Sequence, residues 1–155
     1  MPDHKHAPLF GLFNEIGIIE QLSRASLEAR LPKGLIAPHF TVLNHLVRLG
    51  DGRAPIEMAR AFQVPKTTLT HTLKGLEGQG LIEMRPNPDD GRSKLVYLMP
   101  SGRVLRDQTI AALGPDFDRI AAALDIQALA QIIPVLRELR IFLDDDQNRA
   151  PVRSG

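Results

Sequence analysis

Apolar residues recur at helical spacing on both sides of a short break in the middle of the chain. The first run consists of Ile56, Ala59 and Phe62, and the second of Leu69, Leu73 and Leu76. The break at Val64–Pro65 separates the runs, and Pro65 suits the first turn of a following helix because its missing N–H is not needed there. The pattern therefore predicts two short helices joined by a tight turn, as in a helix-turn-helix.

The second of these helices is expected to present a polar face away from its leucines. At about 100° per residue, this face carries Thr67, His71, Lys74 and Gly78, flanked by Thr68, Thr70 and Gly75. Hydroxyls, an imidazole and an ammonium can hydrogen-bond base edges in a major groove, and Lys66 at the helix start is placed to contact phosphates. An ordinary amphipathic helix with a solvated polar face is the alternative.

The apolar period changes from helical to alternating after residue 80. Residues 81–84 predict one strand, 86–91 a turn-rich segment and 95–99 a return strand. The cations on or beside the expected tip, within reach of phosphates or a minor groove, are Arg85, Arg92 and Lys94. Asp90 precedes Arg92 by two residues, which places its carboxylate to hold the guanidinium in one pose. A solvated turn pair is the alternative for these two residues.

These pieces together resemble the MarR (multiple antibiotic resistance regulator) family of bacterial transcription factors, over the run from Leu31 to Gly102. The matching segments are 35–43 before the helix-turn-helix, 59–76 across it, 79–82 at its exit, 89–98 with the Asp-x-Arg signature of the wing, and 100–102 at the start of the next helix. The resemblance implies a mainly α winged helix-turn-helix with a two-stranded wing and long N- and C-terminal dimerisation helices.

The resemblance also implies how the unit would meet DNA. The helix over about 66–79 reads the major groove, and Arg92, positioned by Asp90, reaches the minor groove. Gly75 and Gly78 depart from the family, whose members often carry charged or larger polar residues there. We expect these glycines to let the helix approach the DNA backbone or to leave a solvent gap, and a weaker helix end is the alternative.

Both ends of the chain are rich in apolar residues at helical spacing. The N-terminal stripe consists of Leu9, Leu12, Phe13, Ile16, Ile19 and Leu22, on a helix that runs to about Arg30. A helix from Ser101 is expected to break at Gly114–Pro115, and a last helix, with Pro134 inside it, starts near Asp125. So many apolar positions in a short chain predict an obligate two-fold dimer, which the resemblance also implies. A monomer whose end helices pack on each other is the alternative.

These patterns divide the chain into four parts. We expect an N-terminal dimerisation helix over 1–34, a winged helix-turn-helix over 35–100, C-terminal dimerisation helices over 101–146 and a disordered tail over 147–155.

Composition narrows the possible partners. With 155 residues, 43% of them hydrophobic, the chain is long enough for one domain with its own core. The net charge is only +1, so a DNA-binding surface has to be a local patch. Residues 63–103 carry six basic and four acidic side chains, whereas 124–146 carry two and five. The chain has no cysteine, which excludes disulfides and thiolate metal sites. We expect no cofactor, no metal, no membrane segment and a cytoplasmic location.

The predicted function is a sequence-specific transcriptional regulator, with ligand-responsive repression favoured, that binds double-stranded DNA at a pseudo-palindromic operator as a homodimer. The resemblance implies a small aromatic or carboxylic effector, for which the candidate contacts are His39, Phe40, His45 and Arg53. Each also fits an ordinary core or surface residue. The alternatives are a winged-helix protein-interaction module without DNA binding, or a small enzyme, for which the common nucleotide-binding and nucleophile motifs are missing.

Overall fold

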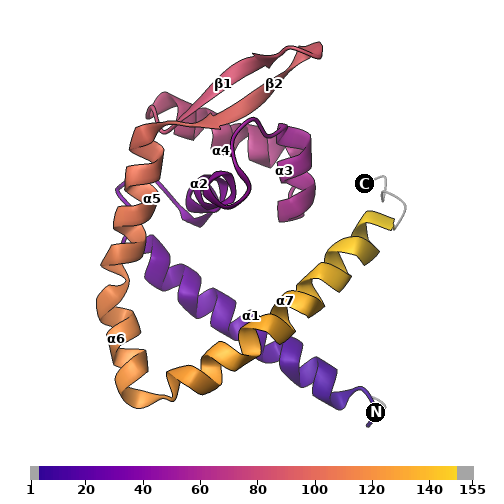
Figure 1. Cartoon of the computed structure of the whole chain (residues 1–155), viewed down its shortest axis with the longest axis vertical. Helices are drawn as coiled ribbons and strands as arrows, with labels where there is room; N and C mark the ends of the chain where they lie inside the picture. Colours follow the sequence, from indigo (N-terminus) through magenta and orange to yellow (C-terminus); the bar gives the residue numbers. More distant parts are fainter. Residues whose placement is uncertain (1–3, 150–155) are drawn as a thin grey trace. The chain divides into compact units, whose positions relative to one another are not determined.

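The computed structural model describes residues 4–149, which are mainly helical with one two-stranded antiparallel sheet. In chain order the elements are α1 (Ala7–Glu28), α2 (Ala37–Leu49), α3 (Pro55–Phe62), α4 (Lys66–Gly78), β1 (Ile82–Asn87), β2 (Asp90–Leu98), α5 (Pro100–Ala112), α6 (Gly114–Ala123) and α7 (Ile126–Arg149) (Figure 1). The predicted fold class is confirmed. The chain divides into two units, Met1–Leu113 and Gly114–Gly155, which are described separately below.

The predicted helix-turn-helix is formed by α3 and α4. The turn between them depends on Gln63, which has left-handed backbone angles (φ 54°, ψ 45°). Pro65 stands one residue earlier than expected, as the N-cap of α4 rather than in its first turn. Its carbonyl accepts the N–H of Leu69 at 3.1 Å, so Pro65 begins the hydrogen-bond ladder of α4.

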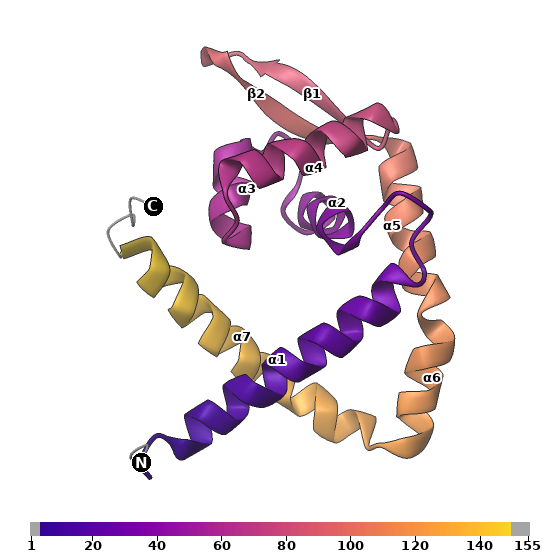
Figure 2. The same cartoon turned by 180° about the vertical axis from the view of Figure 1, so that it is seen from behind.

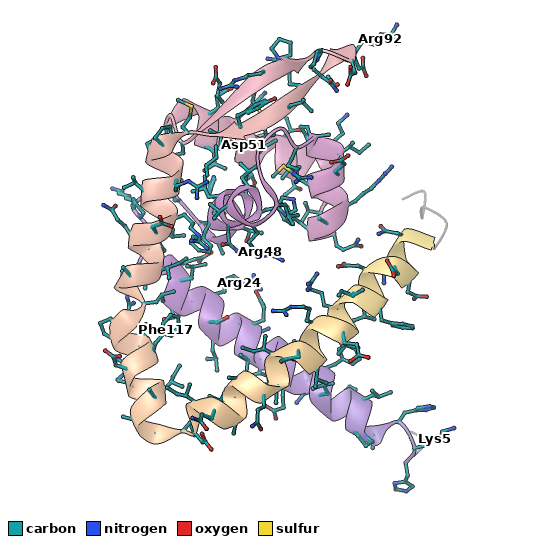
Figure 3. The ribbon with its side chains drawn as sticks, viewed as in Figure 1. Lys5, Arg24, Arg48, Asp51, Arg92 and Phe117 are labelled. Carbon is teal, nitrogen blue, oxygen red and sulfur yellow. The ribbon has the colours of Figure 1, made fainter. Side chains whose placement is uncertain are left out.

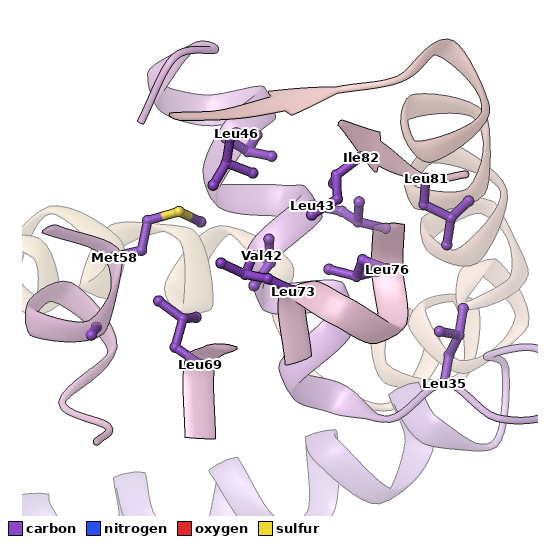
Figure 4. Packing of buried hydrophobic residues seen from close by; sticks show 12 residues of the cluster. Leu35, Val42, Leu43, Leu46, Met58, Leu69, Leu73, Leu76, Leu81 and Ile82 are labelled. Atoms are coloured by element: carbon purple, nitrogen blue, oxygen red, sulfur yellow. The ribbon is translucent and has the colours of Figure 1, made fainter. Parts of the chain in front are cut away.

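The core of this unit lies between α2, α3, α4 and the base of the hairpin (Figure 4). The leucine stripe of α4 is buried as predicted, with Leu76 completely enclosed. On α3 the prediction is wrong at one position, because Ile56 is 48% exposed while Met58 is completely buried. Met58, Ala59 and Phe62 fall within one arc of about 100° on this short helix, and Ile56 lies outside it.

The hairpin is longer than its sequence pattern predicts. Pairing runs from Ile82 opposite Leu98 to Asn87 opposite Asp90, which leaves only residues 88–89 as the turn. Figures 1 and 2 show the hairpin tip projecting away from the helices of the same unit. At its base, β2 has a second neighbour: the N–H of Gly52 donates to the carbonyl of Val96 at 2.9 Å, and the N–H of Val96 donates to the carbonyl of Arg53 at 2.9 Å.

Helix α5 belongs to the same unit as the hairpin, rather than only to a C-terminal dimerisation segment as predicted. Gly102 is buried at its start, and the guanidinium of Arg106 donates to the side-chain oxygen of Asn44 on α2 at 3.1 and 3.2 Å. The predicted break between these helices is present but lies earlier than expected, at Leu113, since α5 ends at Ala112 and α6 begins at Gly114, so that Gly114 and Pro115 belong to the first turn of α6.

The second unit consists of α6 and α7. Asp125 caps α7 as expected, with its carboxylate accepting the N–H groups of Gln127 and Ala128 at 3.0 and 3.3 Å. The helix includes Pro134 and continues to Arg149. The predicted tail is therefore wrong for residues 147–149, which are helical, and its remainder lies outside the described residues.

Apolar side chains remain exposed along the terminal helices. On α1, Phe10 is 74% and Leu22 67% exposed, and no residue of this helix is buried. On α7, Phe142 is 65% exposed, and α6 leaves Phe117 half exposed. Among residues 4–149, no single helix is long and apolar enough to cross a membrane, although α5–α6 and α7, taken together as a bent pair, meet those criteria of length and composition.

Candidate DNA interface

The outer face of α4 presents the polar side chains expected from its sequence. Its exposed members are Lys66, Thr67, Thr68, Thr70, His71 and Lys74. The hydroxyl of Thr70 donates to the carbonyl of Lys66 at 2.8 Å, which leaves its oxygen free to accept from a ligand. Leu69 and Leu73 anchor the opposite face in the core, so this polar face is held outward.

The expectation for Gly75 is wrong, because this residue faces α2 instead of the outer surface. A Cβ at Gly75 would lie 3.1 Å from Nε2 of His39. Nδ1 of His39 accepts the N–H of Ile36 at 2.9 Å, and burial lowers the pKa of His39, as does the nearby His71. The missing side chain thus allows α2 and α4 to approach closely. Gly78 has nothing within 4 Å and does face open space.

Arg92 lies in an irregularity at the tip of the hairpin. Pro86 pairs with Lys94 and Asn87 with Asp90, so residues 91–93 have no partners on β1. Such a bulge redirects side chains, and Figure 3 shows Arg92 at the far end of the hairpin. Among the described residues, the carboxylate of Asp90 accepts the backbone N–H of Arg92 at 3.0 Å and forms no ion pair with its guanidinium. Asp90 therefore shapes the turn, which corrects the expectation that it holds the Arg92 side chain.

The other two wing cations lie on opposite faces of the hairpin. Arg85 pairs across the strands with Leu95, whereas Lys94 pairs with Pro86 one position further along. The guanidinium of Arg85 lies 4.1 Å from the centre of the Tyr97 ring and 3.0 Å from the carboxylate of Glu83. These contacts engage Arg85 within the wing, while Lys94 is exposed.

The four candidate effector contacts do not converge on one site. His39 faces α4, as described above, and the His45 ring packs edge-on against Phe62 with centroids 5.0 Å apart. Burial lowers the pKa of His45, assisted by the charges of Arg48 and Arg53. Arg53 donates to carbonyls at the end of α2, and Phe40 is half-buried. His45 and Arg53 therefore act as packing and capping residues.

A cavity of about 330 Å³ lies elsewhere in the first unit, and none of those four residues lines it. Its wall comprises Glu20 and Arg24 of α1, Ala37, Pro38, Thr41 and Val42 of α2, Phe62, Val64, and Thr68, Leu69 and Thr72 of α4. Arg24 donates to both carboxylate oxygens of Glu20, through Nε at 2.8 Å, and this pairing lowers the pKa of Glu20. Figure 3 shows Arg24 on α1. The lining is thus mostly apolar, and the charges of Glu20 and Arg24 in it neutralise each other.

A core-anchored helix with an exposed polar face, next to a hairpin that carries an arginine at its tip, defines the winged helix-turn-helix class. A model of the MarR family matches residues 33–93. Wild-type MarR from E. coli in its apo form superposes with a TM-score of 0.70 at 26% identity, over 83% of this chain and 96% of that one. A mutant MarR from E. coli complexed with operator DNA gives a TM-score of 0.68 at 24% identity, over 88% and 99% of the two chains. A MarR family transcriptional regulator from Rhodococcus sp. RHA1 gives 0.69 at 20% identity, over 90% and 98%. Residues 33–93 thus match the MarR family model, and the chain has the fold of MarR family transcription regulators.

Two parts of this unit were not indicated by the residue pattern. Glu20 and Arg24 belong to the polar side of α1, and only the fold brings them to the cavity. Asp51 lies between two glycines, which predicts a turn, but its contact with β2 joins residues 47 positions apart.

Proposed function

We propose that this protein is a sequence-specific transcriptional regulator that binds double-stranded DNA. The observation that carries the proposal is the pairing of an outward polar face on α4 with Arg92 in the bulge of the wing. Thr67, His71 and Lys74 would read base edges, while Lys66 and Lys94 would contact phosphates. Arg92 would enter the minor groove, where its charge is favoured. The solved structure of the E. coli MarR mutant with operator DNA supports this use of the fold.

We further propose that the protein acts as a homodimer on a pseudo-palindromic operator. The support is the exposed apolar surface of α1 in one unit and of α6 and α7 in the other, which in water favours association. A second copy of the chain has the same apolar surfaces, so the two copies can cover each other's exposed apolar side chains. The two α4 helices would then meet half-sites about one helical turn, roughly 10 bp, apart.

The test begins with duplexes that the wild-type protein selects from a random pool. Arg92→Ala should weaken binding of the selected duplex by about 1 to 3 kcal/mol in a fluorescence titration at fixed salt. Arg48→Ala is the matched control, because it removes the same charge from an exposed position on α2, where Figure 3 places it away from the hairpin tip. An unchanged Kd for Arg92→Ala, in protein that is folded and dimeric, would remove the wing from the interface.

We propose that regulation uses the cavity between α1, α2 and α4, and that its effector is a small aromatic or carboxylic molecule. Most of its wall is apolar, and Arg24 supplies a guanidinium that can exchange Glu20 for a ligand carboxylate. Thr68 and Thr72 of α4 line the same space, so a ligand there would contact the DNA-reading helix directly.

Benzoate is a suitable first probe for this cavity. It should raise the thermal midpoint of the wild-type protein and weaken DNA binding, and both effects should decrease in Arg24→Met. Equal effects in Arg24→Met and wild type would place the site elsewhere.

A winged-helix module that binds another protein is the second candidate, because the apolar terminal helices would also suit a heterologous partner. A gel shift of random duplex at several salt concentrations separates the two. Binding that falls steeply with salt supports the DNA-binding function, and no shift even at low salt supports the module.

A further inference from the structure

The base of β2 is held on both of its edges. β1 pairs with one edge, and on the other the N–H of Leu98 donates to Oδ1 of Asp51 at 2.6 Å. Together with the bonds of residues 52–53 to Val96, this contact satisfies the N–H and carbonyl of Val96 and the N–H of Leu98, which β2 directs away from β1. The part of β2 nearer the tip has no such cover among the described residues.

The segment that holds β2, residues 51–53, is itself fixed to the end of α2. Nε of Arg53 donates to the carbonyl of Gly50 at 3.1 Å, and its terminal nitrogen donates to the carbonyl of Leu49. Gly50 and Gly52 have φ values of 94° and 76°, which favour glycine, so the segment reverses sharply. A Cβ at Gly52 would lie 3.4 Å from the Tyr97 hydroxyl, so the segment also lies close to the hairpin side chains.

Helix α2 therefore contacts both parts of the candidate DNA interface. Its first turn meets α4 where His39 faces Gly75, and the segment after its last turn meets β2 through Asp51. The direction of the wing relative to α4 consequently depends in part on this second edge of β2, where Asp51 holds Leu98 and residues 52–53 hold Val96. Figure 3 shows Asp51 near the base of the hairpin and Arg92 at its far end.

We infer that Asp51 is a positioning residue for DNA binding: its carboxylate, bound to the Leu98 N–H, sets the wing so that Arg92 meets DNA while α4 occupies the major groove. The inference rests on the DNA-binding function proposed above. Asp51 need not touch DNA. Its negative charge repels the DNA phosphates. Removing the charge alone should therefore strengthen DNA binding, whereas losing the positioning of the wing should weaken it.

Two substitutions separate these effects. Asp51→Asn and Asp51→Ala both remove the charge, but only asparagine keeps an oxygen that can accept the Leu98 N–H. On a duplex selected by the wild-type protein, Asp51→Asn should bind as tightly as wild type or tighter. Asp51→Ala should bind about three- to tenfold more weakly, as expected for one lost hydrogen bond. Equal affinities for the two variants would overturn the inference.

A double variant tests whether Asp51 acts through the wing. If the loss in Asp51→Ala arises because Arg92 is misplaced, then Asp51→Ala should cost less than twofold when added to Arg92→Ala. Fully multiplicative losses would show that Asp51 acts on binding by another route. Thermal unfolding of each variant, followed by circular dichroism, checks that all are folded.

A measurement without DNA keeps this inference separate from the proposed function. Because the chain has no cysteine, spin labels can be placed at Thr70→Cys on α4 and Asp89→Cys at the wing turn, with unlabelled chains added in excess. Pulsed electron paramagnetic resonance should give a broader distribution of the distance between the two labels for Asp51→Ala than for Asp51→Asn or for the labelled protein that keeps Asp51. Identical distance distributions would refute the positioning role of Asp51 even if DNA binding is confirmed. Failure of the wild-type protein to bind any duplex would instead refute only the proposed DNA-binding function.

Discussion

Gly102 occupies the tightest glycine position of the first unit. It is buried in the first turn of α5, where an added Cβ would lie 2.2 Å from the carbonyl oxygen of Leu81. The same Cβ would lie 2.9 Å from a methyl of Leu98 and 3.2 Å from one of Leu43. The Leu81 oxygen is not free to retreat, since it accepts the N–H of Met99 at 3.1 Å. Substitution by alanine should therefore move α5 away from the base of the hairpin.

The expected cost follows from three opposing effects. Overpacking of this kind costs about 1 to 3 kcal/mol, and weakening the Met99–Leu81 hydrogen bond adds about 1 kcal/mol. Alanine is a better helix former than glycine by about 1 kcal/mol, which offsets part of that loss. Gly102→Ala should thus lower the free energy of unfolding by about 1 to 3 kcal/mol. For a chain of this length, the thermal midpoint should fall by about 2 to 12 °C.

Gly78→Ala is the matched control, because nothing lies within 4 Å of the position that its Cβ would take. It should leave the stability unchanged or raise it by up to about 1 kcal/mol. Circular dichroism during heating and in urea, at one chain concentration for all variants, measures both, because the stability of a dimer depends on concentration. The packing argument fails if Gly102→Ala is as stable as Gly78→Ala.

Three further predictions concern base reading, pH and assembly. Thr67→Ala and His71→Ala should change the consensus selected from a random duplex pool, since both side chains lie on the exposed face of α4. Lys66→Ala should instead lower the affinity for all sequences alike. An unaltered consensus would mean that α4 does not read bases. Burial lowers the pKa of His39 and His45 in the folded state, so the unfolded chain binds more protons below about pH 6.5. Stability should therefore be greatest above that pH and decrease as the pH falls. Urea titrations should show a shallower decrease for His39→Asn, whose side-chain oxygen can replace Nδ1 as the acceptor of the Ile36 N–H. An identical pH dependence in that variant would exclude His39 as a source of the effect. Deletion of residues 136–155 removes Leu136, Leu139, Ile141, Phe142 and Leu143, each worth about 1.5 to 3 kcal/mol when buried, so the truncated chain should lose its dimer and its operator affinity. Analytical ultracentrifugation decides this, and a wild-type monomer at tens of micromolar, or a truncated chain that still dimerises, would contradict the two-fold arrangement.

Local periodicity was sufficient to predict the elements themselves. The leucine stripe identified α4 and its buried face, because helical geometry alone places Leu69, Leu73 and Leu76 together. The change to an alternating pattern located the hairpin, and Asp125 marked the start of α7 through its capping chemistry. The exposed face of α4 followed directly, as the complement of the buried stripe.

The contacts between distant segments were decided only by the tertiary structure. Gly75 faces His39 and not the outer surface, because α2 packs there, and no property of α4 alone contains that information. His45 packs on Phe62, and Arg53 caps α2, since burial and hydrogen-bond geometry assign them these partners. Asp51 bonds a strand 47 residues away, because chain folding creates that neighbour, whereas sequence spacing reports only neighbours within one helix or strand.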